Sequence, residues 1–258
     1  MPRSGALDRP ALELANRLVG NDPSAAGLET TLGGVTLRVA DAMTVAVTGA
    51  QAVVSVDGRP RAWGEPVGLR AGQTLRVGPT RSGLRCYLAF GGGIVVPRVL
   101  GSRATDTLSG TGPAPLSAGD EVPVGDSDNL PQGADVVVPR TRQSPLTLRC
   151  TVGPRRDWFT TEAVESMTGS TYTVSSDSNR VGLRLEGPAL AREEPRELPS
   201  EGIVLGAVQV PASGQPLVFL NDHPTTGGYP VIAVVDPGDL PACAQLRPGD
   251  EVRLRLVQ

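Results

Sequence analysis

The sequence contains no lysine, because all 24 of its basic residues are arginine. A chain without lysine cannot form a lysine Schiff base, cannot supply a P-loop lysine, and cannot carry biotin or lipoyl on a lysine amine. Histidine is also scarce, since His223 is the only one. The three cysteines, Cys86, Cys150 and Cys243, lie far apart and form no CxxC pair, which argues against a Cys/His zinc site. Their odd number and wide spacing fit a reducing compartment.

Aromatic residues make up only 3% of the chain, and its net charge is −3. There is neither a basic patch nor a set of aromatics interleaved with arginines, which argues against binding to nucleic acid or to a membrane surface. No apolar run approaches the ~18 residues of a membrane helix. The first 20 residues are interrupted by charge and lack the apolar stretch of a signal peptide. We therefore expect a cytoplasmic protein.

Glycine (32) and proline (24) are abundant, which favours many turns and short strands over long helices. Apolar residues alternate over 35–58, and apolar runs at 84–96 and 134–139 predict buried strands. A helix is predicted over 160–169, where a threonine cap precedes it and Gly169 ends it. Residues 11–20 fit either a helix or an irregular lead-in. The pattern predicts a mainly β fold with few short helices, its strands closed into barrels or stacked as sheets.

Weak internal repeats favour two similar β units. "AGDEV" at 118–122 and "PGDEV" at 248–252 each follow a leucine-containing turn and open a short β run. Chance is the alternative, because Gly-Asp turns are common in β proteins. A duplication predicts two β-barrel-like units of ~130 residues, the usual domain size, spanning 1–133 and 134–258.

The stretch "NDHPTTGGYP" at 221–230 gathers the densest set of candidate functional groups. Asp222 and His223 are candidates for an acid/base pair, since imidazole titrates near neutrality. The hydroxyl- and glycine-rich run that follows suits a carboxylate, carbamate or phosphate oxygen, because glycine lets backbone N–H groups approach a ligand closely. The alternative is a tight loop whose side chains satisfy their own backbone. The candidate binding residues of this run are Thr225, Thr226, Gly227, Gly228 and Tyr229.

Three further stretches contribute candidate binding residues. Arg103 offers a forked cationic donor beside Asp106, although the two would equally suit a structural ion pair. Asn179 and Arg180 lie in a polar stretch. The alternative to a binding role is a solvated turn, because Asp, Ser and Asn favour turns. Glu201 faces either the site or solvent, because isolated carboxylates are normally exposed.

Several stretches occur together in an order that resembles a known family: "YLAFGGGIVVPRVLGSRATD", "SSDSNRVGLRLEG", "PSEGIVLGAVQVPASGQPLVFLNDHPTTGGYPVIAVV" and "LRPGDEVRLR". They resemble the biotin-dependent carboxyltransferase family, also called allophanate hydrolase subunit 2, from about residue 16 onward. "TTGGYP" and "SEG…GAVQVP" are the most specific parts, and Gln209 in the latter joins the candidate binding residues. Pro224 departs from the family pattern, in which glutamine is more usual. The run "TDTLSGTGPAPLSAGD" departs as well, since the family usually shows Gly-Gly and a basic residue after the "TD" pair.

The resemblance implies cyclophilin-like β-barrel units and a kinase-inhibitor-type sister subunit, allophanate hydrolase subunit 1. It implies a cytoplasmic heteromer that hydrolyses 5-oxoproline to glutamate with ATP, together with a possible lactam-utilisation-type third subunit. Two alternatives stay open because fold and site are shared within the family. The chain would be the carboxyltransferase component of a biotin-dependent urea or amide carboxylase, or a non-catalytic regulator that sequesters the sister subunit. No GxxxxGK[ST] motif occurs, so ATP would be bound by other means or by another subunit.

Overall fold

The computed structural model describes residues 4–127, 130–131, 137, 144–193 and 196–257. They divide into two compact units. The first, here called the sheet unit, comprises Asp8–Thr105 and Gly112–Thr141. The second, the barrel unit, comprises Met1–Leu7, Asp106–Thr111 and Arg142–Gln258. The predicted boundary between 133 and 134 falls outside the described residues. The loop Asp106–Thr111 and the segment that ends at Leu7 are grouped with the barrel unit.

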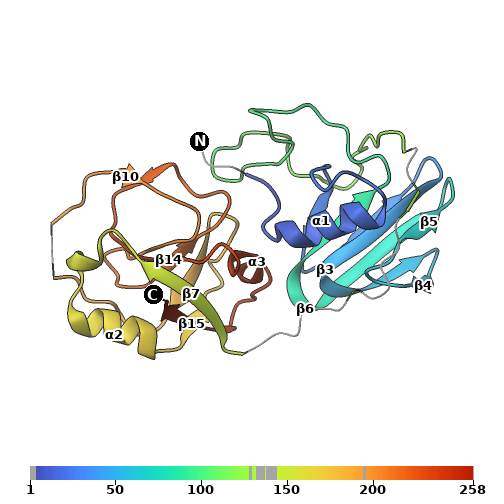
Figure 1. Ribbon diagram of the computed structural model, residues 1–258. Helices are drawn as coiled ribbons and strands as arrows, with labels where there is room; N and C mark the ends of the chain where they lie inside the picture. Colours follow the sequence, from blue (N-terminus) through green and yellow to red (C-terminus); the bar gives the residue numbers. More distant parts are fainter. Residues whose placement is uncertain (1–3, 128–129, 132–136, 138–143, 194–195, 258) are drawn as a thin grey trace. The chain divides into compact units, whose positions relative to one another are not determined.

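The sheet unit is an antiparallel β-sheet with one helix against it (Figure 1). The order of the strands is β1-β6-β3-β4, with β2 also paired to β6 and β5 to β3. Helix α1 begins after Asp8, whose carboxylate accepts the N–H of Ala11 at 3.2 Å. The helix buries Ala15 and Leu18 against alanines of β3 and β6. The elements are α1 (Arg9–Leu18), β1 (Leu28–Thr31), β2 (Val35–Arg38), β3 (Met43–Val56), β4 (Arg59–Arg61), β5 (Val67–Leu69) and β6 (Thr74–Phe90).

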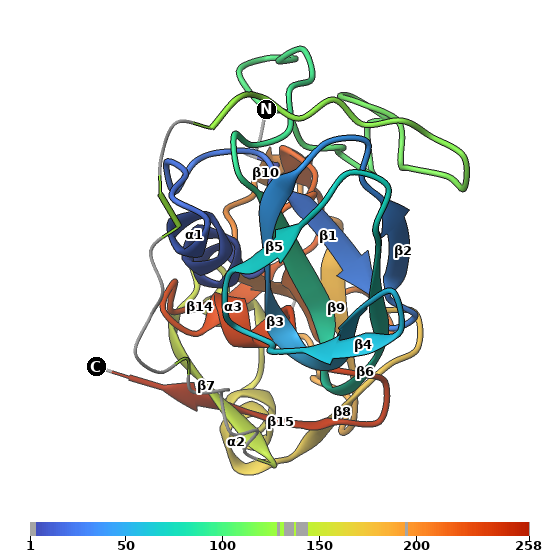
Figure 2. The same ribbon diagram turned by 90° about the vertical axis from the view of Figure 1, so that its right-hand side faces the viewer.

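The barrel unit is a closed barrel in the order β11-β12-β9-β8-β15-β7-β14. Its pairs are antiparallel except β15 with β7, and β14 returns to β11 to close the ring. A separate two-stranded ribbon joins β10 to β13. Figure 2 shows β7, β8, β9 and β15 of this unit from a second side. The elements are β7 (Leu146–Val152), η1 (Arg156–Trp158), α2 (Thr161–Gly169), β8 (Tyr172–Val174), β9 (Gly182–Glu186), β10 (Glu201–Gly202), β11 (Ala207–Gln209), β12 (Leu217–Phe219), β13 (Thr226–Gly227), β14 (Val231–Val235), α3 (Leu240–Cys243) and β15 (Glu251–Leu256).

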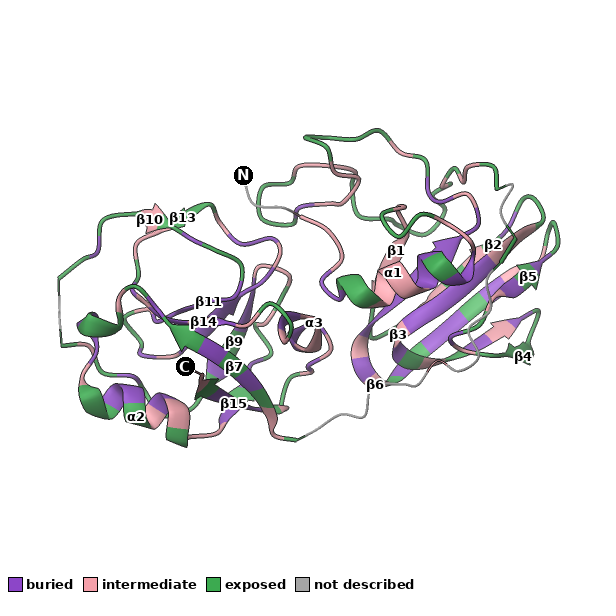
Figure 3. Ribbon diagram, in the orientation of Figure 1, coloured by how far each residue is buried: buried purple, intermediate pink, exposed green. Residues whose placement is uncertain are grey.

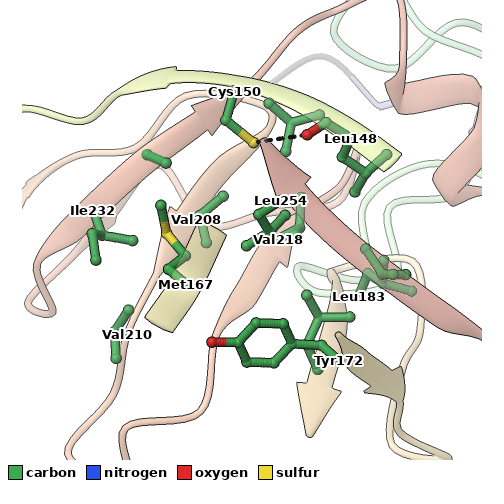
Figure 4. Close-up of a cluster of buried hydrophobic side chains, with 14 of the residues drawn as sticks. Leu148, Cys150, Met167, Tyr172, Leu183, Val208, Val210, Val218, Ile232 and Leu254 are labelled. Carbon is green, nitrogen blue, oxygen red and sulfur yellow. Dashed lines mark hydrogen bonds between the residues drawn. The ribbon is translucent and has the colours of Figure 1, made fainter. Parts of the chain in front are cut away.

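The interior of the barrel is filled with apolar side chains (Figure 4). Leu148, Met167, Tyr172 and Leu254 are among its fully buried members. Burial raises the pKa of the Cys150 thiol to about 12, so this cysteine is an inert part of the core. A filled interior leaves the outer faces and loops of the barrel as the places where a ligand can bind.

The mainly β prediction with few short helices is confirmed. The helix predicted over 160–169 is α2, whose cap residue Thr160 accepts the N–H of Ala163 at 3.1 Å. The lead-in is helical and begins at Arg9. Of the two units, one closes into a barrel, while the described strands of the other form a six-stranded sheet. The run at 134–139 lies almost wholly outside the described residues. Among the described helices, none has the length and apolarity needed to cross a membrane.

Candidate functional site

The segment around His223 lies on the outside of the barrel. On β12, Val218 belongs to the interior core, whereas Leu217 and Phe219 belong to a separate apolar cluster with Ile203 and Ala207. This alternation is expected for a strand with two buried faces. The ring of His223 lies 6.0 Å from the ring of Phe219, centroid to centroid. The candidate residues that follow β12 therefore cover an outer face of the barrel.

Asp222 is fully buried and holds separate segments of the barrel unit together. Its carboxylate accepts hydrogen bonds from Arg180 Nε at 2.8 Å, from Arg180 Nη2 at 3.1 Å, and from the Thr107 N–H and Oγ1 at 3.0 and 2.8 Å. Ser4 Oγ donates to it at 3.0 Å. Burial alone would raise the pKa of Asp222, but the hydrogen bonds from Arg180 and Thr107 outweigh burial and lower it. An ionised carboxylate with its acceptor positions occupied suits holding the chain rather than transferring protons.

Arg180 and Asn221 fix the N-terminal segment next to this ion pair. Arg180 Nη2 donates to the carbonyl oxygen of Gly5 at 2.7 Å. Asn221 Nδ2 donates to the carbonyl oxygen of Ala6 at 2.9 Å. These bonds, across separations of 175 and 215 residues, explain why the N-terminal segment packs with the barrel unit. The contacts of Arg180 within the described structure are thus those of a structural anchor.

His223 has the geometry of a poised proton acceptor. Its Nδ1 lies 2.8 Å from the carbonyl oxygen of Pro224. A carbonyl only accepts, so Nδ1 carries the proton, and in the neutral ring Nε2 then bears the lone pair. Nε2 forms no hydrogen bond with a described residue, and His223 as a whole is buried. An Nε2 lone pair in a fixed tautomer can act as a general base.

The centre of "TTGGYP" is strand β13 and not the tight loop that the sequence leaves open as an alternative. Gly202 pairs with Thr226 and Glu201 pairs with Gly227. Figure 3 shows the ribbon of β10 and β13 with both exposed and intermediate residues. Thr225 and Thr226 are exposed. Their hydroxyls make no hydrogen bond to any residue in the described ranges, so they are available to a ligand.

A side chain at the first glycine of the pair would have to displace the ends of two neighbouring side chains. A Cβ added at Gly227 would lie 2.5 Å from Ile203 Cδ1 and 3.0 Å from Gln209 Nε2. At Gly228 the nearest atom would be the carbonyl oxygen of Leu198, at 3.2 Å. The space beside Gly227 is thus filled by protein side chains, so its role here is to let the ribbon lie close to the barrel.

Gln209 and Tyr229 link the ribbon to strand β11. The buried Gln209 donates from Nε2 to the carbonyl oxygen of Tyr229 at 2.9 Å. The Tyr229 ring is 47% exposed, and the guanidinium carbon of Arg192 lies 5.6 Å from its centroid. Gln209 is therefore a positioning residue for the segment that carries Thr225 to Tyr229.

Glu201 has a cationic partner that its sequence neighbourhood did not reveal. Arg155 donates to Glu201 Oε2 from Nε at 3.0 Å and to Oε1 from Nη2. The hydrogen bond from Arg155 lowers the pKa of Glu201. The side chains are about one-third exposed, so this pair lies at the surface.

The other candidates make turn contacts. Arg103, in the sheet unit, donates from Nε to the Val96 carbonyl oxygen at 2.8 Å. The buried carboxylate of Asp106 accepts the N–H groups of Leu108 and Ser109 at 3.0 and 2.9 Å. Asn179 Oδ1 accepts the N–H of Val181 at 2.8 Å. Asp106 and Asn179 are thus Asx-type turn residues in the barrel unit.

Sequence reasoning missed Arg192, Arg155, Thr107 and Ser4. Arg192 lies in the charged run "AREEP", which has the composition of a solvated turn. Thr107 and Ser4 reach Asp222 across separations of 115 and 218 residues. A local pattern does not encode such pairings. The structure brings together one group of predicted residues, His223 and Thr225 to Tyr229 with Gln209 and Glu201, and a second group at Asp222 with Arg180.

The chain is similar to carboxyltransferase domains over nearly its whole length. A family model described as carboxyltransferase domain, subdomain A and B, matches residues 1–256. A 5-oxoprolinase subunit of Escherichia coli (strain K12) is 40% identical over 254 residues, covering 96% of this chain and 80% of that protein.

Solved structures agree with this assignment. The crystal structure of TTHA0988 is 37% identical with a TM-score of 0.88, covering 98% of this chain and half of that one. The Kluyveromyces lactis urea amidolyase is 30% identical with a TM-score of 0.92, covering all of this chain and 17% of that enzyme. The resemblance read from the motifs is confirmed: this chain belongs to the family of carboxyltransferase domains with subdomains A and B.

Proposed function

We propose that this chain is a subunit of an ATP-dependent 5-oxoprolinase, which opens the lactam of 5-oxoproline to give glutamate. The observation that carries the proposal is the 40% identity to the E. coli 5-oxoprolinase subunit, which extends over 96% of this chain and most of that protein. The partner is a kinase-inhibitor-type sister subunit, with a lactam-utilisation-type third subunit, in the cytoplasm. In the sequence no P-loop is present, so we place the ATP contacts on other subunits.

The chemistry assigned to this chain is recognition of the lactam and proton transfer. His223 Nε2 would accept a proton from the attacking nucleophile while the exposed hydroxyls of Thr225 and Thr226 bind substrate oxygens. Water screens groups on an outer barrel face, so they catalyse weakly until something covers them. We assign that cover to the sister subunit. The interface would bury at least ~1,200 Å².

Reconstitution tests the proposal. We expect the chain to co-elute with the sister subunit in size-exclusion chromatography, and 5-oxoproline turnover to require the full set of subunits and ATP. Robust turnover by this chain alone would contradict a shared site. Co-elution without turnover in any combination would favour the regulator alternative.

His223→Asn tests the assigned base within that assay. Asparagine keeps an N–H donor near the Pro224 carbonyl but has no atom at the Nε2 position. We expect kcat to fall by roughly 10²–10⁴-fold. Ser176→Ala, which removes an exposed hydroxyl from the turn after β8, is the control and should leave kcat unchanged. A His223→Asn complex with wild-type kcat would reject His223 as the base and leave the function standing.

A carboxyltransferase acting on urea or a related amide is the second candidate, supported by the TM-score of 0.92 with urea amidolyase. Because the chain has no lysine, it would receive carboxybiotin from a separate carrier. Carboxybiotin-dependent loss of urea, with no response to 5-oxoproline, would establish this candidate. Covalent biotin found on the chain by mass spectrometry would contradict both assignments.

A further inference from the structure

A hollow of about 350 Å³ opens on the barrel unit between two loops. One wall is residues 189–192 and the other is residues 211–214. Both walls are fixed by main-chain bonds, since the Leu190 N–H donates to the Gly214 carbonyl oxygen at 2.9 Å and the Gly214 N–H to the Pro211 carbonyl oxygen at 3.0 Å. A volume of ~300 Å³ or more is enough for a small organic ligand.

Arg192 is the cation that lines this hollow. Its main chain forms an isolated β-bridge with Phe159, which fixes where the side chain starts. Its Nη2 donates to the carbonyl oxygen of Val210, and its guanidinium lies over the ring of Tyr229. Its Nε is buried without a hydrogen-bond partner, and Nη1 bonds to no residue in the described part of the chain. Leaving a guanidinium N–H unsatisfied in a protein is costly unless water or a ligand binds it.

No carboxylate among the described residues forms an ion pair with Arg192. Partial burial lowers the pKa of Arg192, yet a guanidinium stays charged at neutral pH. A cation that is partly desolvated, stacked on an aromatic ring and paired with no described carboxylate is arranged to receive an anion. The N–H groups of Arg192 that no described residue binds, those of Nη1 among them, can donate charge-assisted hydrogen bonds to a carboxylate.

Arg192 is also connected to the proposed reaction site. Tyr229, on which it stacks, follows the exposed threonines by a few residues in the same segment. Gln209 ties that segment to β11 through the Tyr229 carbonyl. An anion held at Arg192 is therefore anchored against the segment that presents Thr225 and Thr226.

We infer that this hollow binds the carboxylate of the substrate, with Arg192 as its anchor and Tyr229 as the surface that positions the guanidinium. The inference rests on the proposed function, in which the ligand is 5-oxoproline, a lactam with a single carboxylate. The ligand class is therefore a small monocarboxylate. A phosphate group is the alternative anion that Arg192 could bind.

Binding to the full chain and to the reconstituted complex is measured by isothermal titration with 5-oxoproline, with inorganic phosphate, and with 2-pyrrolidinone, which keeps the lactam and lacks the carboxylate. We expect Arg192→Gln to weaken 5-oxoproline binding roughly tenfold or more, because it removes a charge-assisted hydrogen bond. Binding of 2-pyrrolidinone to the wild type should be weaker and insensitive to the substitution.

Two variants control for folding and for charge. Arg184→Gln removes the same charge from a neighbouring hollow and should leave binding unchanged. Arg192→Lys keeps the charge and should retain more affinity than Arg192→Gln. In the complex, Arg192→Gln should raise KM more than it lowers kcat, which general loosening of the fold would not do. Melting temperatures of all variants show whether each is folded.

The outcomes separate the two proposals. Unchanged 5-oxoproline affinity and KM in a folded Arg192→Gln complex would overturn the subsite and leave the oxoprolinase assignment intact. Arg192-dependent binding of phosphate in place of 5-oxoproline would overturn the carboxylate assignment. Arg192-dependent binding of 5-oxoproline in a complete complex that never hydrolyses it would support the subsite and reject the proposed reaction. No binding of any probe to chain or complex would overturn the subsite.

Discussion

Two arginines of the barrel unit, Arg180 and Arg192, show how differently one residue type is used. Arg180 faces the buried carboxylate of Asp222, which also accepts from Thr107 and Ser4, so the charge is fully matched within the protein. Arg192 has a carbonyl oxygen and the face of Tyr229 as partners, and no anion among the described residues. The charge of Arg180 is matched within the protein, whereas the charge of Arg192 is matched by no described residue.

Breaking the matched pair should have the largest effect on stability. Arg180→Met leaves the Asp222 carboxylate buried without its cation, which typically costs about 3–5 kcal/mol. Urea denaturation at pH 7 measures the loss in the free energy of unfolding. Arg184→Met is the control, because Arg184 is exposed and its side chain forms no bond with a described residue. A loss below about 1 kcal/mol for Arg180→Met would remove the contrast between the two arginines.

The pH dependence of stability tests whether the ionised carboxylate of Asp222 stabilises the fold. The folded pKa of Asp222 is lowered, so the carboxylate contributes stability above its unfolded pKa of about 3.9. That contribution is lost as pH falls below this value through the folded pKa. Asp222→Asn should flatten this acid limb of a plot of unfolding free energy against pH. An unchanged acid limb in the variant would assign the acid sensitivity to other carboxylates.

Gly227→Ala should have an intermediate effect, because it moves the ribbon that leads to Tyr229. The new methyl group would meet Ile203 Cδ1 at 2.5 Å, and overpacking of this kind costs about 1–3 kcal/mol. Gly202→Ala, on the paired strand, is the control, since an added Cβ there meets nothing within 4 Å. Thermal unfolding of both variants compares them. Equal melting temperatures would show that the ribbon accommodates the added methyl group without loss of stability.

Arg192→Met should change stability little, within about 1 kcal/mol, because it also removes an N–H that is buried without a partner. The same urea denaturation used for Arg180→Met gives the comparison directly. A loss as large as that of Arg180→Met would mean that Arg192 is structural and would remove the reason to expect an anion there.

Glu201→Gln should have the smallest effect, with an unfolding free energy within error of the wild type. Its pair with Arg155 lies at the surface, where such pairs contribute little. Chemical denaturation at low and high salt measures it. A clear loss that disappears at high salt would show that the pair holds the end of β10 in place.

The sequence predicts those features of this molecule that depend on neighbours along the chain. Alternating apolar residues predict the strands, and the threonine cap with Gly169 predicts α2. The motif around His223 is recognisable, but the reason for Gly227 is packing against Ile203, which only the fold reveals. Arg180 pairs with a residue 42 positions away, and the unmatched state of Arg192 depends on everything that surrounds it. Local composition predicts neither the partner of Arg180 nor the surroundings of Arg192, because tertiary structure decides which residues meet at such separations.

The hydrogen bond between Ser4 and Asp222 can form only late in the synthesis of the chain. The two residues are 218 positions apart, so at usual rates of synthesis Ser4 precedes Asp222 by roughly 10–40 s. During that interval the N-terminal segment has no native carboxylate to bind, and neither does the loop that carries Thr107. Contacts this distant in sequence slow folding, because a long stretch of chain must be ordered before they form. The N-terminal segment of a nascent chain therefore stays without this anchor until the segment after β12 has emerged, and the barrel closes only once β14 and β15 have followed.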